Sequence, residues 1–136
     1  MRTAFTQNQI SLKRSDDLLR GILLFRFPQS DLGAGKLRPA LLLKRIDGDF
    51  NDWLVCMIST QTRHQIQELE VVLTETMSDF SKTGLKKESL VRTSRLAVVQ
   101  SSVFSGKVGT LPAEPFEDIR TRLADWIRGG ESIKAR

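Results

Sequence analysis

The sequence predicts a mainly β domain, in which a small antiparallel barrel or curled sheet carries one C-terminal helix. Two observations lead to this fold class. Short apolar runs, several of them β-branched or alternating, are separated by turn residues over most of the chain. Near the C-terminus the pattern changes to a helical period. A chain of 136 residues is long enough to form one domain with its own core.

Five or six short segments are expected to form the strands. The segment at 66–73 partly alternates, with Glu68 and Glu70 opposite Leu69 and Val71, which is typical of a half-exposed strand. A long polar loop is expected at 74–88. The expected strands cover residues 21–27, 39–46, 53–60, 66–73 and 89–100, with a short turn or strand segment at 103–111.

The C-terminal segment predicts the helix. Pro112 and Pro115 lie at its start, and Gly129 follows its end. Its apolar residues share one face, which we expect to pack on the sheet. That face consists of Phe116, Ile119, Leu123, Trp126 and Ile127.

Around this domain we expect two flanking segments. Residues 1–20 are predicted to be an N-terminal extension, to which we assign no role. Residues 21–128 form the single domain, and residues 129–136 form a polar tail.

Charge and cysteine content narrow the function classes. The formal net charge of +5 favours a polyanionic partner, with nucleic acid first. Cys56 is the only cysteine, so no intramolecular disulfide can form, and a reducing cytoplasm fits. We interpret Cys56 as a buried small hydrophobe, because it lies in an apolar run. No apolar run is long enough to span a membrane, so no membrane association is expected.

No cofactor or metal is expected. The sequence contains neither a G-x-G-x-x-G motif nor a P-loop. One histidine and one cysteine cannot form a zinc site within a single chain. No local cluster of acidic residues resembles a two-metal nuclease site.

Arg38 is the first candidate for chemistry. It lies where a polar loop, residues 28–38, meets the apolar strand that we expect to begin at Pro39. The proline biases Arg38 toward an extended backbone, and a guanidinium matches the geometry of a phosphate. Ser59 and Thr60 close the third expected strand, and their hydroxyl groups with Arg38 can hold a phosphate. Arginine can stabilise the charge of a pentavalent phosphorane but is a poor general base.

His64 is the only imidazole and therefore a candidate for the general base of RNA cleavage. The alternative reading, a surface histidine without a catalytic role, stays open, and so does the identity of the base.

With these residues in view, the chain resembles the MazF/PemK (Kid-like) toxins of bacterial type II toxin–antitoxin systems across roughly residues 21–127. Each motif is short, and it is their common order along the chain that makes the resemblance specific. The matching stretches are Phe27-Pro28, Ser30-Asp31-Leu32, Lys36 to Leu41, Val55 to Gln61, Gly84 to Arg92, Ser94-Arg95-Leu96 and Lys107 to Leu111.

The resemblance implies an SH3-like antiparallel barrel of the CcdB/PemK type that forms a homodimer. It implies a cytoplasmic endoribonuclease that inhibits growth by cutting single-stranded mRNA without a metal, which leaves a cyclic phosphate and a 5′-hydroxyl. Arg38 and Ser59 fall on the family's catalytic positions. RNA is expected along the groove between the 28–38 and 61–65 loops. Further candidate catalytic or RNA-binding residues are Thr60, Gln61, Arg63 and His64, with Asp31 and Lys36 in the RNA-binding loop.

The resemblance also implies an antitoxin partner that covers this groove, and binding to operator DNA as a toxin–antitoxin complex. The sequence departs from the family in four places, one of which is an N-terminal arm that is longer than usual. Arg20 and Gly21 stand where the first strand usually begins with Gly-Asp. The first loop is neutral from Leu32 to Gly35, and Ser59 stands where threonine is common.

Two alternatives remain open at this point. The same barrel can be a non-catalytic module that binds nucleic acid or protein. It can also be a toxin that acts on a protein such as gyrase, since a related fold does so.

Overall fold

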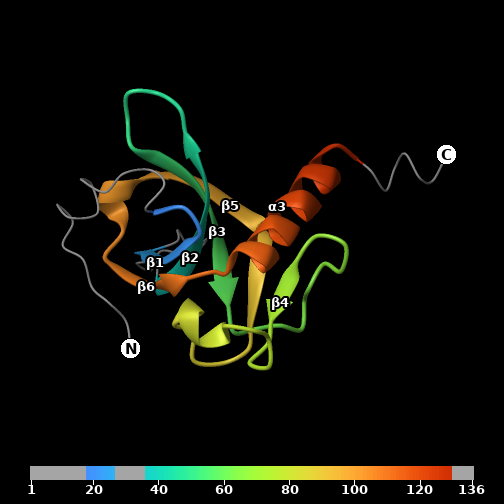
Figure 1. The fold of residues 1–136 in the computed structure, drawn as a ribbon. Coiled ribbons are helices and arrows are strands. Elements are labelled where there is room, and N and C mark those ends of the chain that lie inside the picture. Colours follow the sequence, from blue (N-terminus) through green and yellow to red (C-terminus); the bar gives the residue numbers. More distant parts are fainter. Residues whose placement is uncertain (1–17, 27–35, 130–136) are drawn as a thin grey trace.

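The structure of the chain is a computed structural model that describes residues 18–26 and 36–129 (Figure 1). Most of the predicted N-terminal extension, Asp31, the neutral stretch of the first loop and residues 130–136 lie outside the described residues. The predicted domain limits therefore stay predictions.

The described chain forms one curled antiparallel sheet with a helix on it, which confirms the mainly β fold class (Figure 1). The strands are ordered β4-β5-β3-β2-β1-β6, and every neighbouring pair is antiparallel. The hairpin that joins β2 to β3 projects from the body of the sheet (Figure 1). The strands are β1 (Gly21–Arg26), β2 (Leu37–Ile46), β3 (Asp52–Ser59), β4 (Val71–Leu73), β5 (Ser89–Gln100) and β6 (Gly106–Thr110).

In the described part of the chain, three helical segments accompany the sheet. The 3-10 helix η1 (Phe80–Thr83) lies within the predicted polar loop, and η2 (Ser101–Val103) directly follows β5. The α-helix α3 (Ala113–Ile127) starts after Pro112, and it packs on the sheet through Phe116, Ile119 and Leu123.

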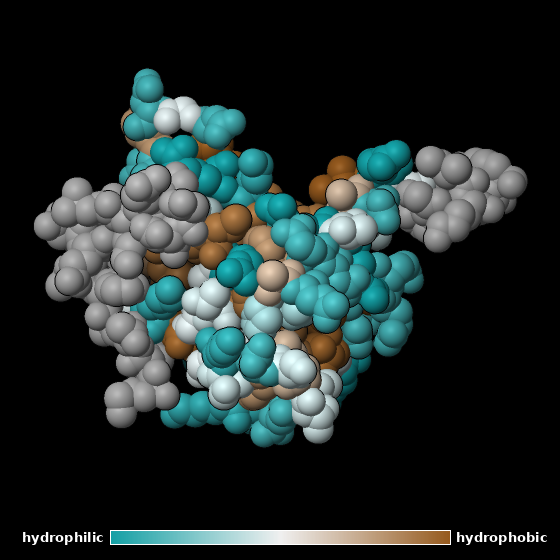
Figure 2. Space-filling view, viewed as in Figure 1, coloured by the Kyte–Doolittle hydropathy of each residue, from teal (hydrophilic) through white to brown (hydrophobic). Residues whose placement is uncertain are grey.

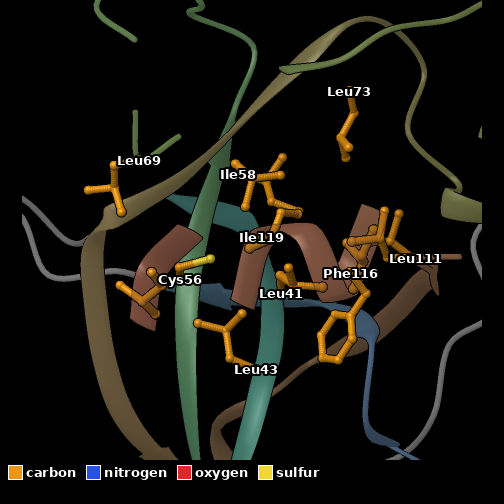
Figure 3. Close-up of a cluster of buried hydrophobic side chains, with 13 residues drawn as sticks. Leu41, Leu43, Cys56, Ile58, Leu69, Leu73, Leu111, Phe116 and Ile119 are labelled. Carbon is orange, nitrogen blue, oxygen red and sulfur yellow. The ribbon is translucent and has the colours of Figure 1, made fainter. Parts of the chain in front are cut away.

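The central strands are apolar on both faces because both faces are buried. Leu41 and Leu43 of β2 belong to a cluster that includes Phe116 and Ile119 of α3 (Figure 3). The alternate residues of the same strand, such as Leu42, belong to a second cluster around Trp53 and Phe104. A strand buried on both sides reads as a continuous apolar run, as residues 40–43 do.

The C-terminal end of α3 differs from the prediction. Trp126 and Ile127 share the apolar face of the helix, yet they are 43% and 66% exposed. Only Phe116, Ile119 and Leu123 are buried. The helix extends past the sheet, so its last turn has no sheet beneath it (Figure 1).

The predicted strand at 66–73 is also shorter than expected. Only Val71–Leu73 pairs with β5. Residues before it turn, because the carbonyl oxygen of Ile66 accepts the N–H groups of Leu69 at 3.0 Å and Glu70 at 2.7 Å. Glu70, predicted to face solvent, is fully buried. The alternation was a coincidence of sequence, since a turn and not a strand sets the direction of these side chains.

β2 begins at Leu37, two residues earlier than predicted. Arg38 therefore belongs to the strand, where it lies opposite Phe25 of β1. Pro39 is tolerated because the ladder between β2 and β3 starts only at Ala40. A strand segment with a neighbour on one side can accept a residue without an N–H.

Candidate functional site

Arg38 and Ser59 line one pocket of about 570 Å³. Antiparallel pairing brings the start of β2 and the end of β3 to the same edge of the sheet, as the pair Ala40 and Met57 shows. The segment between η1 and β5 closes the pocket from another side. The pocket is lined by Leu24, Leu37, Arg38, Pro39, Ile58, Ser59, Thr60, Gly84, Leu85, Lys86, Lys87, Ser89 and Val108.

Arg38 is set on a rigid part of this pocket. Its backbone lies in the ladder between β1 and β2, and its side chain is half-buried. A strand residue next to proline has little backbone freedom, so the direction of the guanidinium is restricted. This placement gives a fixed cation with a fork of donors beside the pocket.

Ser59 ends β3 with a defined hydroxyl geometry. Its Oγ accepts the backbone N–H of Gln61 at 3.0 Å, which is a local serine turn. The hydroxyl hydrogen takes no part in this bond, so Ser59 can act as a donor toward a ligand in the pocket. A buried hydroxyl donor beside a guanidinium suits an anion with several oxygens, such as a phosphate.

Lys86 and Lys87 are pocket residues that the sequence reasoning did not name as site residues. Both are exposed at the mouth of the pocket. Their position follows from two glycines. A Cβ on Gly84 would lie 2.0 Å from the carbonyl oxygen of Val108, and one on Gly109 would lie 2.3 Å from that of Thr83. The backbones of this segment and β6 therefore touch, which only glycine allows.

The signal for these lysines was present in the sequence. They lie inside one of the stretches that carry the family resemblance, directly after Leu85. The pattern of two glycines twenty-five residues apart shows its meaning only when the two backbones are seen in contact.

The remaining predicted site residues have different places. Thr60 lines the pocket with Arg38 and Ser59. Gln61, Arg63 and His64 are exposed on the connection that follows and do not line it. Lys36 is exposed immediately before β2, also outside the lining. Asp31 lies outside the described residues.

Two buried ionisable groups lie behind the site. Burial opposes ionisation of Glu70, but hydrogen bonds from Ser94 and Ile66 and the charge of Arg92 outweigh it, so its pKa is lowered. Burial raises the pKa of the Cys56 thiol, and the charge of Glu70 adds to the effect. Cys56 therefore stays a protonated, buried thiol inside the core.

The described residues contain neither a metal-binding cluster nor a membrane-spanning helix. Within residues 18–26 and 36–129, no three His, Cys, Asp or Glu side chains gather closely enough to hold a metal ion. In the same ranges, no helix combines the length and apolar character needed to cross a membrane.

The chain is similar to known proteins in both sequence and fold. The family described as PemK-like, MazF-like toxin of type II toxin-antitoxin system matches residues 20–127. No curated protein sequence gives a match. Among solved structures, the Mycobacterium tuberculosis toxin MazF-mt6 is similar, with 19% sequence identity and a TM-score of 0.58. That alignment covers 78% of this chain and 94% of that chain. At this sequence identity, the structural match shows similarity of fold alone.

Proposed function

Because the chain belongs to the PemK-like, MazF-like toxins of type II toxin–antitoxin systems, we propose that it is an endoribonuclease that cuts single-stranded mRNA and inhibits growth. One observation carries the proposal. Arg38 and Ser59 line the same pocket, with Lys86 and Lys87 at its mouth. A guanidinium, a hydroxyl donor and two ammonium groups form a site for the RNA backbone.

The proposed chemistry uses the 2′-hydroxyl of the RNA as the nucleophile. Its oxygen forms a bond to phosphorus, the bond from phosphorus to the 5′-oxygen breaks, and a cyclic phosphate and a 5′-hydroxyl result. The route needs no metal, because the attacking group belongs to the substrate. Arg38 stabilises the negative charge that grows on the phosphorane oxygens, and Ser59 donates a hydrogen bond to one of them. Lys86 and Lys87 attract the flanking phosphates.

The reaction also needs a general base that takes the proton of the 2′-hydroxyl and a general acid that gives one to the leaving 5′-oxygen. None of the described residues that line the pocket carries a carboxylate or an imidazole. Arg38 is a poor base at its ordinary pKa. His64 stays the candidate base that the sequence offers. It is exposed and lies five residues after Ser59 in the chain.

That missing base is the observation that favours the second candidate, a non-catalytic module that binds nucleic acid through the same pocket. This module would bind RNA with an affinity whose logarithm falls linearly with the logarithm of the salt concentration, and it would release no product. The third reading, a toxin that acts on gyrase, would give gyrase-dependent DNA breaks and leave RNA intact.

The test is RNA cleavage by the purified protein in EDTA on a long single-stranded RNA, with the product ends mapped. We expect discrete cuts with 5′-hydroxyl ends. Arg38→Ala should lower the rate by about a thousandfold, because a charge-stabilising donor is lost. Arg128→Ala removes the same charge from the exposed end of α3, and it should cut at the wild-type rate. Wild-type cleavage by Arg38→Ala would refute the role of Arg38, and intact RNA with folded wild type would favour the binding module.

We also propose a homodimer, an antitoxin that covers the pocket, and operator DNA binding by the toxin–antitoxin complex, all in the cytoplasm. Exposed apolar side chains support a protein partner. They include Trp126 and Ile127 on α3 and Leu96 and Val98 on β5. Hydrophobic surface is visible at the C-terminal end of α3 (Figure 2). A monomer in light scattering at micromolar concentration would contradict the dimer.

A further inference from the structure

β5 carries an irregularity beside the connection from Thr60 to Glu70, which we call the 60–70 connection. The ladder with β3 steps from the pair Cys56 and Leu96 to the pair Met57 and Arg92. Residues 93–95 of β5 therefore have no partner on β3. Such a bulge leaves backbone N–H groups without a ladder bond, and a buried unpaired N–H is costly.

The end of the 60–70 connection fills this irregularity. Thr93 donates its hydroxyl hydrogen to the carbonyl oxygen of Leu69 at 3.3 Å. The backbone N–H of Ser94 donates to Oε2 of Glu70 at 3.2 Å. The Ser94 N–H, which has no partner on β3, is thus satisfied by a segment that is not a strand.

Glu70 is the centre of this contact. Its side chain is 0% exposed. Its Oε1 accepts the N–H of Ile66 at 3.0 Å, and its Oε2 accepts the Ser94 hydroxyl at 2.6 Å. Nε of Arg92 lies 3.5 Å from the same Oε2. We call these contacts, with the Ser94 N–H, the Glu70 clasp. It joins the 60–70 connection to itself and to β5.

Other bonds fix the rest of the connection. At its start, Ser59 accepts the Gln61 N–H. The amide of Gln65 donates to the Glu70 carbonyl oxygen at 2.8 Å, and Arg122 of α3 donates to the Gln67 carbonyl oxygen at 3.3 Å. The exposed residues Arg63 and His64 thus lie on a short span between two anchored ends, although the segment is polar and has no regular secondary structure.

We propose that Glu70 is a positioning residue for RNA binding. The clasp fixes the 60–70 connection, and through it the exposed side chains of Gln61, Arg63 and His64, at the side of the pocket. This inference rests on the proposed function and adds to it a buried residue that touches no RNA. A preorganised connection contacts RNA without a further loss of conformational entropy, so the clasp acts on affinity.

A glutamine cannot replace Glu70, although it has nearly the same shape. The carboxylate accepts hydrogen bonds with both oxygens, one toward Ile66 and one toward Ser94. An amide has one acceptor and one donor end. In either orientation its NH2 group faces an N–H donor, so the connection comes loose at one side and Arg92 loses its counter-charge. Glu68→Gln is the matched control, since Glu68 is exposed on the same connection and the charge change is identical.

The first measurement needs no RNA. Hydrogen exchange of the backbone amides is compared in wild type, Glu70→Gln and Glu68→Gln. We expect the Ile66 and Ser94 amides to exchange about a hundredfold faster in Glu70→Gln while core amides of β2 and β3 keep their protection. Glu68→Gln should match wild type. Unchanged exchange at both amides in Glu70→Gln would overturn the clasp itself.

The second measurement is steady-state cleavage of a short RNA that carries a cut site mapped with wild type. Glu70→Gln should raise KM about tenfold and change kcat less than about threefold, because the clasp acts on binding and not on the reacting phosphate. Glu68→Gln should leave both constants unchanged. A fall in kcat at constant KM would overturn the positioning role and point to general loss of structure.

Coupling gives the sharpest readout. If the clasp acts through the connection, removal of Arg63 should remove much of its benefit. We expect the effect of Glu70→Gln on KM to shrink from about tenfold to about threefold in an Arg63→Ala background. Full additivity would overturn the inference.

Two further outcomes are separable. If wild type leaves RNA intact, the proposed function fails, and this inference fails with it. If wild type cuts and Glu70→Gln has the same KM as wild type, only this inference fails.

Should Glu70→Gln not fold, Ser94→Ala replaces it, since that change removes one bond of the clasp and leaves the carboxylate and its backbone partners. A smaller rise in KM, about threefold, is then expected, because only one of the bonds is lost.

Discussion

The two connections that flank the pocket are fixed by different physical means. The 60–70 connection is fastened by a buried carboxylate with hydrogen bonds to Ile66 and Ser94. The connection from Thr74 to Glu88, the 74–88 connection, is fastened by close backbone packing of Gly84 against Val108 and of Gly109 against Thr83. One route depends on charge, and the other depends on the absence of a side chain.

The difference has consequences for what each connection tolerates. A contact held by a buried carboxylate tolerates changes in the volume of neighbouring side chains, but it fails when the carboxylate is removed or protonated. Backbone packing is indifferent to pH but fails when a single methyl group is added. Each connection carries cationic side chains: Lys86 and Lys87 of the 74–88 connection line the pocket, whereas Arg63 of the 60–70 connection is exposed outside the lining. Each connection can therefore be loosened by its own substitution, and the other connection then serves as the control.

The largest effect is expected at Gly84. Gly84→Ala places a Cβ 2.0 Å from the Val108 carbonyl oxygen, at a backbone φ of 73°. We expect a loss of about 4 kcal/mol in unfolding free energy, from the clash and the left-handed backbone together. Urea denaturation measures it. RNA cleavage should fall as well, because Lys86 and Lys87 move with the connection.

Gly129→Ala is the matched control for this prediction. Its φ of 75° is nearly the same, but no atom lies within 4 Å of the added Cβ. Only the cost of the left-handed backbone remains, which lowers the unfolding free energy by about 1 kcal/mol. Equal losses in the two variants would mean that backbone conformation, and not contact with β6, fixes the 74–88 connection.

The second effect is smaller and depends on pH. The pKa of Glu70 is lower in the folded protein than its ordinary value of 4.5. The ionised clasp therefore stabilises the fold above pH 4.5, and its contribution is lost as the pH falls through the folded pKa. Glu70→Gln should cost about 3 kcal/mol at pH 7, since it breaks a buried charged network. The difference from wild type should shrink progressively as the pH falls below 4.5.

Urea denaturation over this pH range measures the difference. The difference between wild type and Gly84→Ala should stay constant over the same range, because no titrating group takes part in that contact. A pH-independent cost of Glu70→Gln would show that the shape of the side chain, and not its charge, fastens the 60–70 connection.

Local patterns and long-range contacts also differ in how well the sequence predicts them. Buried strands such as β2 and β3 were predictable, since apolar runs report burial on both faces. The position of Arg38 and Ser59 at one edge follows from antiparallel pairing of two consecutive strands. These features depend on residues near one another in the chain or on one simple pairing rule.

The fastening of the connections was not predictable in the same way. Glu70 meets Ser94 across twenty-four residues, and the bulge that creates this demand is a property of the β3–β5 register. The alternation of Glu68 and Glu70 with apolar residues instead suggested two solvent-facing carboxylates. Likewise, Gly84 reads as an ordinary loop glycine until β6 is placed against it. Long-range contacts of single polar or small residues leave no periodic trace.

The smallest predicted effect concerns Arg20, which combines a charged side chain with a backbone conformation that favours glycine. Its φ of 69° is the left-handed conformation that favours glycine, and the family usually has glycine here. Its guanidinium donates to the Leu111 carbonyl oxygen at 3.2 Å. The next residue, Gly21, has no room for a side chain, because a Cβ would lie 2.7 Å from the Leu18 carbonyl oxygen. This chain thus has its glycine at the crowded position 21 and a cation at the left-handed position 20.

Arg20→Ala and Arg20→Gly separate the two terms. Arg20→Ala loses the hydrogen bond and keeps the strained backbone, whereas Arg20→Gly loses the bond and relieves the strain. We expect Arg20→Gly to be more stable than Arg20→Ala by about 1 kcal/mol, measured by urea denaturation at pH 7. Because neither term involves a carboxylate, the gap should be the same at pH 4, unlike the cost of Glu70→Gln. An Arg20→Gly variant no more stable than Arg20→Ala would mean that the left-handed backbone at this position carries no strain, and that the contact with Leu111 alone accounts for the arginine.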